Sequence, residues 1–352
     1  MNKRLYQLDL LKVLATFMVL TLHILMHGAL GKEMGVSQFL QSWGIDFFCL
    51  PAVNIYALIT GYLCYQKSTT NKKIFNFYFK TVCYSLITFL IFSLLISNAF
   101  TLKYFLDSTF IISRHSYWYT SSYIVTMLIS PLLNAGIEKI SKEGLRNILI
   151  IILIILCCLP FVTNRPVAYL NGGYNPLWLI SLYLIGGYIG KYIEINKIKK
   201  SRFLLIIIIA ISILFSLTIK YFGNYTEISY LKIMSSMLAN YNAPFIFMQA
   251  LCMFLLFLTF EIKSKKIQEV LKWLSDKAYF IYIVHNGPIT GAVLTGAIAY
   301  MFVNLNKTII ALDVILSVVI LFVITLILCI IIEFLYKILH KIFKKAFKKH
   351  KI

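Results

Sequence analysis

Ten long apolar stretches take up most of this chain, and they constrain its fold more than any other feature. Each is long enough to cross the hydrocarbon core of a bilayer, about 30 Å thick, as a helix. The stretches lie at about 8–27, 44–66, 75–97, 116–136, 146–163, 175–193, 203–222, 241–261, 278–302 and 309–335. With 60% hydrophobic and 13% charged residues, the composition excludes an ordinary soluble domain. The sequence therefore predicts an all-α integral membrane protein with about ten transmembrane helices.

The distribution of basic residues indicates how the chain is oriented. When successive connections are assigned to alternate sides of the membrane, 27 of the 34 Lys and Arg residues gather on one side. Short basic loops stay in the cytoplasm, so we expect both termini to be cytoplasmic. The formal net charge of +21 therefore indicates membrane topology, with the lipid bilayer as partner and no nucleic acid.

The apolar stretches follow one another closely, so we expect one membrane domain over residues 1–336. Residues 337–352 alternate Lys with Ile and Phe at helical spacing, which predicts a basic amphipathic cytoplasmic tail on the anionic inner leaflet. The seven cysteines form no C-x-x-C pair, so we expect neither a bound metal nor a disulfide framework.

The first apolar stretch contains three ionisable side chains, Asp9, Lys12 and His23. A charge at the centre of a bilayer costs roughly 2.5–3.5 kcal/mol, so such side chains usually face a polar cavity and a partner. Lys12 and His23 are eleven residues apart, which returns them to one face of a helix, about 16 Å apart along its axis. This spacing predicts an elongated site; a structural, hydrogen-bonded histidine is the alternative for His23.

The pattern D-x-x-K-x10-H, formed by Asp9, Lys12 and His23, resembles the opening of the acyltransferase-3 family of bacterial membrane O-acyltransferases. That family usually has Arg where this chain has Lys12. The likeness continues in order through VNIYALITGY at 53–62, WY at 118–119 with SPLL at 130–133, and FIYIVH at 280–285. The second segment is similar to the family's F-F-x-x-S-G-F/Y, with Thr60 in place of Ser, and the last to its G-I-Y-L-x-H.

The resemblance implies a ten-span, multi-pass enzyme of the bacterial cell membrane, close to short members found with polysaccharide genes. Such members transfer an acyl group, usually acetyl, from cytoplasmic acetyl-CoA to a hydroxyl of an extracytoplasmic polysaccharide, and polysaccharide-assembly proteins are their candidate partners. A transporter or exporter of a glycan or small polar solute is the alternative, with the ionisable stripe as its path.

Acyl transfer needs a base for the hydroxyl proton and cations for the donor phosphates. His23 is the predicted base, because an imidazole exchanges protons near neutral pH, and Asp9 is grouped with it as the partner that orients Lys12. Lys12, Lys72, Lys73 and Lys80 are the predicted donor-binding residues. The last three stand where the family often has an R-x-x-R pair, and positive-inside charge explains Lys72 and Lys73 equally well.

The predicted acceptor-binding residues have polar or aromatic side chains. Some are expected on the extracytoplasmic side of the membrane and others inside the helix bundle. Interfacial aromatic belts and hydrogen bonds between helices are the alternatives for them. A break at His285-Asn286-Gly287-Pro288 is predicted in the ninth stretch, as occurs where backbone lines a cavity. The acceptor set comprises Trp118, His115, Asp46, His285 and Asn54.

Overall fold

The computed structural model describes residues 4–28, 30, 35–67, 70–96, 100–165, 168–302 and 309–349, with the backbone alone for 168, 302 and 342–349. Helix makes up 83% of the structure, and the described part contains no strand. The all-α prediction is therefore confirmed. The helices are α1 (Tyr6–Gly28), α2 (Val36–Cys49), α3 (Ala52–Cys64), α4 (Asn71–Leu95), α5 (Leu102–Thr109), α6 (Trp118–Lys139), α7 (Lys142–Leu153), η1 (Ile154–Cys158), α8 (Leu159–Val162), η2 (Ala168–Gly173), α9 (Pro176–Tyr192), α10 (Ile195–Lys199), α11 (Arg202–Tyr225), α12 (Ser229–Met237), α13 (Pro244–Leu258), α14 (Lys265–Ser275), α15 (Ala278–His285), η3 (Gly291–Thr295), α16 (Gly296–Phe302) and α17 (Ile310–Lys349).

Among the described residues, seven helical segments are long and apolar enough to cross a membrane. They are Tyr6–Gly28, Val36–Cys64, Asn71–Leu95, Trp118–Lys139, Lys142–Val162, Arg202–Tyr225 and Ile310–Lys341. The other three apolar stretches form α9 with 17 residues, α13 with 15, and the interrupted run from α15 to α16. The count of ten spans and the cytoplasmic termini stay predictions.

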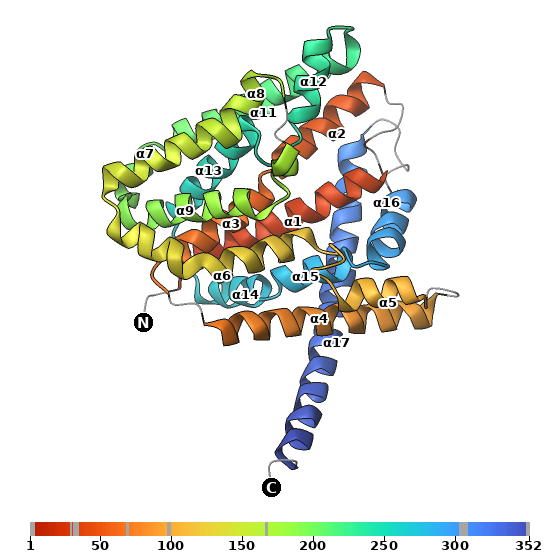
Figure 1. Cartoon of the computed structure of the whole chain (residues 1–352). Helices are drawn as coiled ribbons and strands as arrows, with labels where there is room; N and C mark the ends of the chain where they lie inside the picture. The colour runs from red at the N-terminus through yellow and green to blue at the C-terminus, as the bar shows by residue number, and fades with distance from the viewer. Residues whose placement is uncertain are drawn as a thin grey trace.

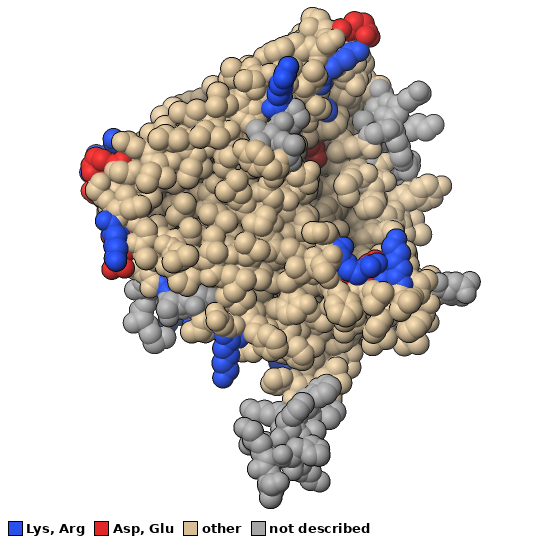
Figure 2. All heavy atoms as spheres, in the orientation of Figure 1, with Lys and Arg blue, Asp and Glu red and all other residues tan. Residues whose placement is uncertain are grey.

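Helix α1 is the central element of the bundle. It contacts α2, α3, α13, α14, α15, α16 and α17, so its polar stripe is turned toward protein. Helix α9 lies beside both α3 and α6, and α17 crosses α1, α4 and α15 (Figure 1). The face of the molecule in Figure 2 is largely uncharged: most of its charged residues lie at the edges, and one group of Lys and Arg lies on the right-hand side. This is the surface expected of a bundle surrounded by lipid.

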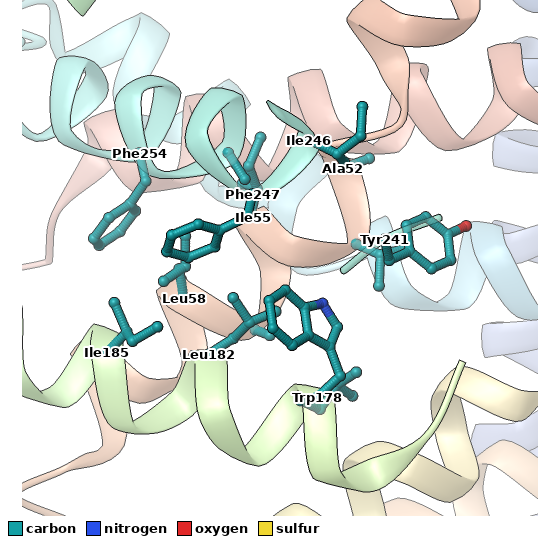
Figure 3. Packing of buried hydrophobic residues seen from close by; sticks show 14 of the residues in the cluster. Ala52, Ile55, Leu58, Trp178, Leu182, Ile185, Tyr241, Ile246, Phe247 and Phe254 are labelled. Carbon is teal, nitrogen blue, oxygen red and sulfur yellow. The ribbon is translucent and has the colours of Figure 1, made fainter. Parts of the chain in front are cut away.

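Helices α3 and α9 approach each other closely because glycines lie at their contact. A Cβ atom on Gly61 would stand 2.0 Å from the carbonyl oxygen of Tyr183, and one on Gly186 would stand 2.2 Å from that of Leu58. Small residues let membrane helices approach closely enough for dispersion contacts and hydrogen bonds to hold them. Side chains of α3, α9 and α13 interdigitate beside this contact, around the buried indole of Trp178 (Figure 3).

Helix α17 continues without interruption from Ile310 to Lys349, past the expected boundary between residues 336 and 337. Residues 350–352, and the side chains beyond Lys341, lie outside the described part of the chain. The division into a domain over 1–336 and a tail over 337–352 therefore stays a prediction.

Candidate active site

A cavity of about 250 Å³ lies in the interior, along the polar stripe of α1. Both Lys12 and His23 line it, so the two residues share one space along about 16 Å of helix rise. Helices α3, α4, α6, α14 and α15 supply most of the other walls. The lining residues are Lys12, Thr16, Val19, Leu22, His23, Val53, Tyr56, Thr60, Phe77, Trp118, Tyr119, Tyr123, Tyr241, Ser275, Ala278, Tyr279, Tyr282 and His285.

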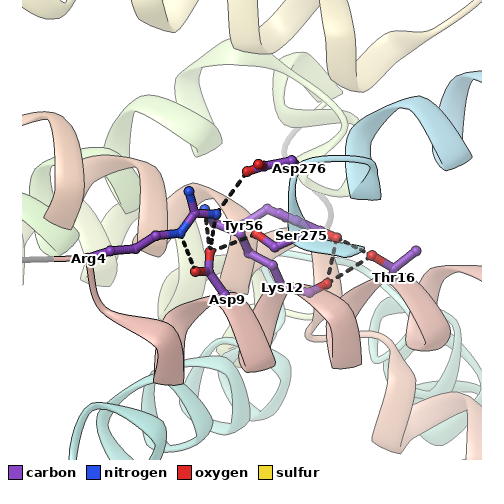
Figure 4. A network of polar contacts seen from close by, with 7 residues as sticks. All are labelled: Arg4, Asp9, Lys12, Thr16, Tyr56, Ser275 and Asp276. Atoms are coloured by element: carbon purple, nitrogen blue, oxygen red, sulfur yellow. Dashed lines mark hydrogen bonds and ion pairs between the residues drawn. The ribbon is translucent and has the colours of Figure 1, made fainter. Parts of the chain in front are cut away.

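An ion-pair network holds the Lys12 end of the cavity (Figure 4). The Arg4 guanidinium lies 2.6 Å from Oδ2 of Asp9 and 2.8 Å from Oδ1 of Asp276. Ser275 Oγ donates to Oδ1 of Asp9 at 2.8 Å. The hydrogen bond with Asp9, joined by a weaker one with Asp276, raises the pKa of Arg4 above its ordinary value, so the pair persists at physiological pH. The network fastens the start of α1 to the end of α14.

Lys12 is only loosely held by this network. Its Nζ lies 3.8 Å from Oδ1 of Asp9, whereas the closest partner of that carboxylate is Arg4. The predicted pairing of Asp9 with Lys12 is therefore present, but Arg4, which sequence reasoning did not assign to the site, is the stronger partner. The Lys12 side chain keeps 26% of its surface exposed, so its ammonium group can bind an anion in the cavity.

Asp9 does not line the cavity and stands far from His23. Fourteen residues of α1 separate them, which is about 21 Å of rise. The Asp9 carboxylate therefore cannot share a reacting atom with the His23 imidazole. Asp9 instead contacts Arg4, Ser275 and Lys12, which is the arrangement of a residue that orients Lys12, and its part in catalysis stays a prediction.

Two histidines meet at the other end of the cavity. Nε2 of His285 lies 2.9 Å from Nδ1 of His23, and Nδ1 of His285 lies 2.7 Å from the carbonyl oxygen of Ile281. His285 is fully buried, whereas His23 is partly exposed to the cavity. The pair joins α1 to the end of α15, and its contacts restrict both rings.

These contacts fix which ring nitrogen of His23 is free. A carbonyl oxygen can only accept, so Nδ1 of His285 carries a proton and its Nε2, in the neutral ring, is an acceptor. Nδ1 of His23 then donates to that Nε2, which leaves the lone pair of His23 on its own Nε2. His23 is thus held in the tautomer that can take a proton at Nε2.

The predicted break in the ninth apolar stretch is confirmed, because α15 ends at His285 and helical structure resumes at Thr290. Side-chain hydroxyls satisfy the interrupted backbone. Thr290 Oγ1 donates to the carbonyl of Val284 at 2.5 Å and accepts from the Gly287 amide at 2.9 Å. Thr295 Oγ1 donates to the carbonyl of His285 at 2.8 Å. The break therefore gives His285 a fixed position at membrane depth.

Aromatic side chains form most of the wall between the two ends. Trp118 stacks on Tyr241 with ring centroids 5.5 Å apart, and Tyr174 lies 4.7 Å from Trp118. Sequence reasoning found Trp118 but missed six cavity tyrosines. Four of them had a signal, since helical spacing puts 119 with 123, and 279 with 282, on one face. The six are Tyr56, Tyr119, Tyr123, Tyr241, Tyr279 and Tyr282.

Three of the four lysines predicted to bind the donor do not line the cavity. Lys72 and Lys73 are exposed in the first turn of α4. Lys80 is half-buried and lies over the ring of Phe280, with its Nζ 4.1 Å from the ring centroid. Only Lys12, of the four predicted donor-binding lysines, reaches the cavity.

The predicted acceptor-binding residues separate into two groups. Trp118 and His285 line the cavity, whereas Asn54, Asp46 and His115 do not. The Asn54 amide is used between helices: it donates to the carbonyl of Tyr241 at 2.7 Å and accepts from the Trp178 indole at 2.9 Å. The structure therefore agrees with the alternative interpretation of Asn54, a residue that hydrogen-bonds neighbouring segments of the bundle to each other.

Asp46 and His115 lie elsewhere in the outer half predicted for the chain. Asp46 is buried on α2, where Lys220 of α11 supplies the opposite charge. Lys220 also places its Nζ 3.8 Å from the ring centroid of Trp43. His115 is exposed in the turn before α6, with a φ of 53°. Neither side chain is positioned to touch a molecule in the cavity.

A helical membrane protein with a basic imidazole and an ammonium group at opposite ends of one internal cavity has the parts of a group-transfer enzyme. A family model described as an acyltransferase domain matches residues 5–334, nearly the whole chain. The chain belongs to the acyltransferase-3 family. The resemblance drawn from its motifs is therefore confirmed, and with it the class of membrane acyltransferase. Neither the curated proteins nor the solved structures gave a match.

Proposed function

We propose that this protein transfers an acyl group, with acetyl favoured, from cytoplasmic acyl-CoA to a hydroxyl of an extracytoplasmic polysaccharide. The observation that carries the proposal is the single cavity that joins Lys12 to the His23–His285 pair. A cation at one end and a proton acceptor at the other are the two groups that the reaction requires, at a separation comparable with an extended pantetheine arm. Membership of an acyltransferase family supports the same reaction class.

In this proposal His23 is the general base. The acceptor hydroxyl gives its proton to Nε2 of His23 while its oxygen attacks the thioester carbonyl carbon. The C–O bond forms, the C–S bond breaks, and the departing thiolate takes the proton from His23, so that the products are an ester and a free thiol. His285 accepts a hydrogen bond from Nδ1 of His23 throughout, and it thereby keeps the ring in its working tautomer.

Lys12 is the proposed contact for a donor phosphate. Its ammonium group lies at the end of the cavity near the predicted cytoplasmic face, and Asp9 holds it only at 3.8 Å. Ser275 lines the same end. The nucleotide end of the donor then stays near the inner face while its thioester reaches His23, so the acyl group crosses most of the membrane on an extended arm.

The aromatic wall is the proposed surface for the sugar acceptor. Trp118 and Tyr241 line the cavity, and Tyr174, which lies behind this wall, packs against both, with ring centroids 4.6 to 5.5 Å apart. Aromatic faces combined with hydroxyl groups suit a sugar ring, which has apolar faces and polar edges. This assignment keeps Trp118 as an acceptor-binding residue.

The experiment that tests the proposal measures donor consumption and acceptor modification together. The purified full chain is incubated in proteoliposomes with acetyl-CoA and a polysaccharide acceptor, and released thiol and polysaccharide mass are followed. We expect thiol release together with a mass increase of one acetyl group per modified repeat. Uptake of a glycan or small solute without thiol release supports the alternative of a transporter. Polysaccharide of unchanged mass in cells with and without the protein argues against the acceptor class.

A further inference from the structure

Lys80 belongs to a second charged cluster, away from the cavity. Its Nζ lies over three rings, 4.1 Å from the centroid of Phe280, 5.4 Å from that of Tyr84 and 5.8 Å from that of Tyr336. These rings come from α15, α4 and α17, which meet here (Figure 1). No ion pair in the described part of the chain includes Lys80. Its ammonium group is therefore fixed by aromatic faces and lacks a carboxylate in contact.

Two more lysines adjoin this position and share one carboxylate. Lys277 Nζ lies 3.5 Å from Oε2 of Glu333, and Lys337 Nζ lies 3.0 Å from Oε1 of the same residue. Lys80 interacts electrostatically with all three of these groups. Three ammonium groups around a single carboxylate leave an excess of positive charge, which one anionic group would complement.

The surroundings of this cluster suit a lipid. Phe79 beside Lys80, Trp273 on α14, and Phe334 and Ile338 on α17 all have exposed apolar side chains. Lys80 follows the first turns of α4, and Lys277 follows α14. Both positions belong to basic connections that are predicted to face the cytoplasm. A phosphate held by the lysines would leave its acyl chains beside these apolar side chains.

We propose that Lys80, Lys277 and Lys337 bind the phosphate headgroup of an anionic phospholipid in the inner leaflet. Charge complementarity identifies the headgroup, since three lysines face one glutamate, and basic pockets between membrane helices on the cytoplasmic side are known sites for such lipids. This site is separate from the acyl-transfer cavity, and lipid binding can be measured without turnover. It gives Lys80 a ligand other than the acyl donor.

The test is lipid binding to the purified full chain in detergent, followed by native mass spectrometry with phosphatidylglycerol or phosphatidylcholine of matched acyl chains. The site variant is Lys80→Gln/Lys277→Gln/Lys337→Gln. The matched control is Lys197→Gln/Lys199→Gln/Lys200→Gln, which removes the same charge from exposed lysines in and beside α10. We expect the site variant to bind phosphatidylglycerol about 100-fold more weakly, because each of its three lysines contributes a factor of about five, and the control to be unchanged.

Four results overturn the proposal. Equal losses in the two variants mean that general charge attraction is responsible, and equal affinity for the two lipids means that the headgroup is not recognised. Displacement of phosphatidylglycerol by coenzyme A at matched concentration means that the three lysines bind the acyl donor and not a lipid. If the triple variant aggregates, Lys80→Gln alone leaves both Glu333 pairs intact, and we expect it to lower phosphatidylglycerol affinity severalfold. An unchanged affinity in Lys80→Gln contradicts the proposal.

Discussion

Nε2 of His285 lies 2.9 Å from Nδ1 of His23, and this one hydrogen bond joins two motifs that are 262 positions apart in the chain. His285 is itself held by the Ile281 carbonyl at 2.7 Å and is fully buried. The ring of His23 is therefore oriented by a rigid neighbour, and Nε2 is its free nitrogen. A general base needs this kind of fixed geometry, because proton transfer depends on the distance to the acceptor atom.

Replacing His23 by alanine should abolish acyl transfer while the protein still folds. General acid–base catalysis contributes a factor of roughly 10²–10⁴, so kcat should fall by about that amount. The loss should appear in thiol release from acetyl-CoA by the purified protein, with a thermal unfolding midpoint close to that of the unchanged chain.

His27 provides the control for the His23 variant. It is a histidine one turn further along α1, exposed, and not among the residues that line the cavity. His27→Ala should keep most of the activity. If the His23→Ala protein is active, another residue is the general base, and His285 is the next candidate.

Replacing His285 tests whether it positions His23. His285→Leu removes the acceptor for Nδ1 of His23, so kcat should fall, by less than in His23→Ala, with little change in KM for the donor. His285→Gln supplies an amide oxygen that can accept the same hydrogen bond and should recover part of the loss. The measurement is kcat against pH for the unchanged protein and the His285→Leu and His285→Gln variants. Equal activity of the Leu and Gln variants contradicts a role through that hydrogen bond.

The sequence predicted most of the cavity along α1 but little of its walls. Asp9, Lys12 and His23 stood out because charge in an apolar stretch is costly, and helical periodicity placed Lys12 and His23 on one face. The contact of His23 with His285 depends on which helices are neighbours. Helical periodicity says nothing about that, so His285 was assigned to substrate binding.

The lysines of α4 were predicted to bind the donor, but they do not line the cavity. Lys72, Lys73 and Lys80 were assigned to the donor by charge and predicted side alone, and no periodic signal separates a lysine that faces the cavity from one that faces lipid headgroups. The cavity tyrosines were missed for a related reason. An aromatic residue in an apolar stretch is the usual filling of a membrane bundle, and only the tertiary structure distinguishes the tyrosines that border an open space.

Gly61→Ala should destabilise the fold through the α3–α9 contact. The added Cβ would lie 2.0 Å from the Tyr183 carbonyl oxygen, so the helices must separate, and overpacking costs typically 1–3 kcal/mol. The measurement is the thermal unfolding midpoint in one detergent. Gly136→Ala in α6 is the control, because its Cβ meets nothing closer than 3.9 Å, and its midpoint should be unchanged or higher. Equal midpoints for the two variants would show that the close approach is dispensable.

Replacing Trp118 tests the proposed acceptor surface. Trp118→Ala removes the ring that stacks on Tyr241, so KM for the polysaccharide should rise several-fold, as the loss of an aromatic contact of about 0.5–1.5 kcal/mol predicts. Hydrolysis of acetyl-CoA without acceptor should be unchanged, and thiol release measured with and without polysaccharide separates the two effects. An equal loss in both assays would mean that Trp118 supports the fold and has no separate acceptor role.

Replacing Lys12 tests the donor end of the cavity. Lys12→Ala should raise KM for acetyl-CoA by about 10- to 100-fold, because a hydrogen bond to a charged group contributes about 1.5–3 kcal/mol. Lys12→Arg should keep or improve donor binding, since a guanidinium group can bind phosphate with two parallel hydrogen bonds.

Lys72→Ala is the matched control: it removes the same charge from an exposed position on α4 that does not line the cavity. Because Lys12 alone among the predicted donor-binding lysines reaches the cavity, Lys72→Ala should leave KM unchanged. A rise in KM with Lys72→Ala and none with Lys12→Ala would place the donor outside this cavity and remove the proposed path along α1.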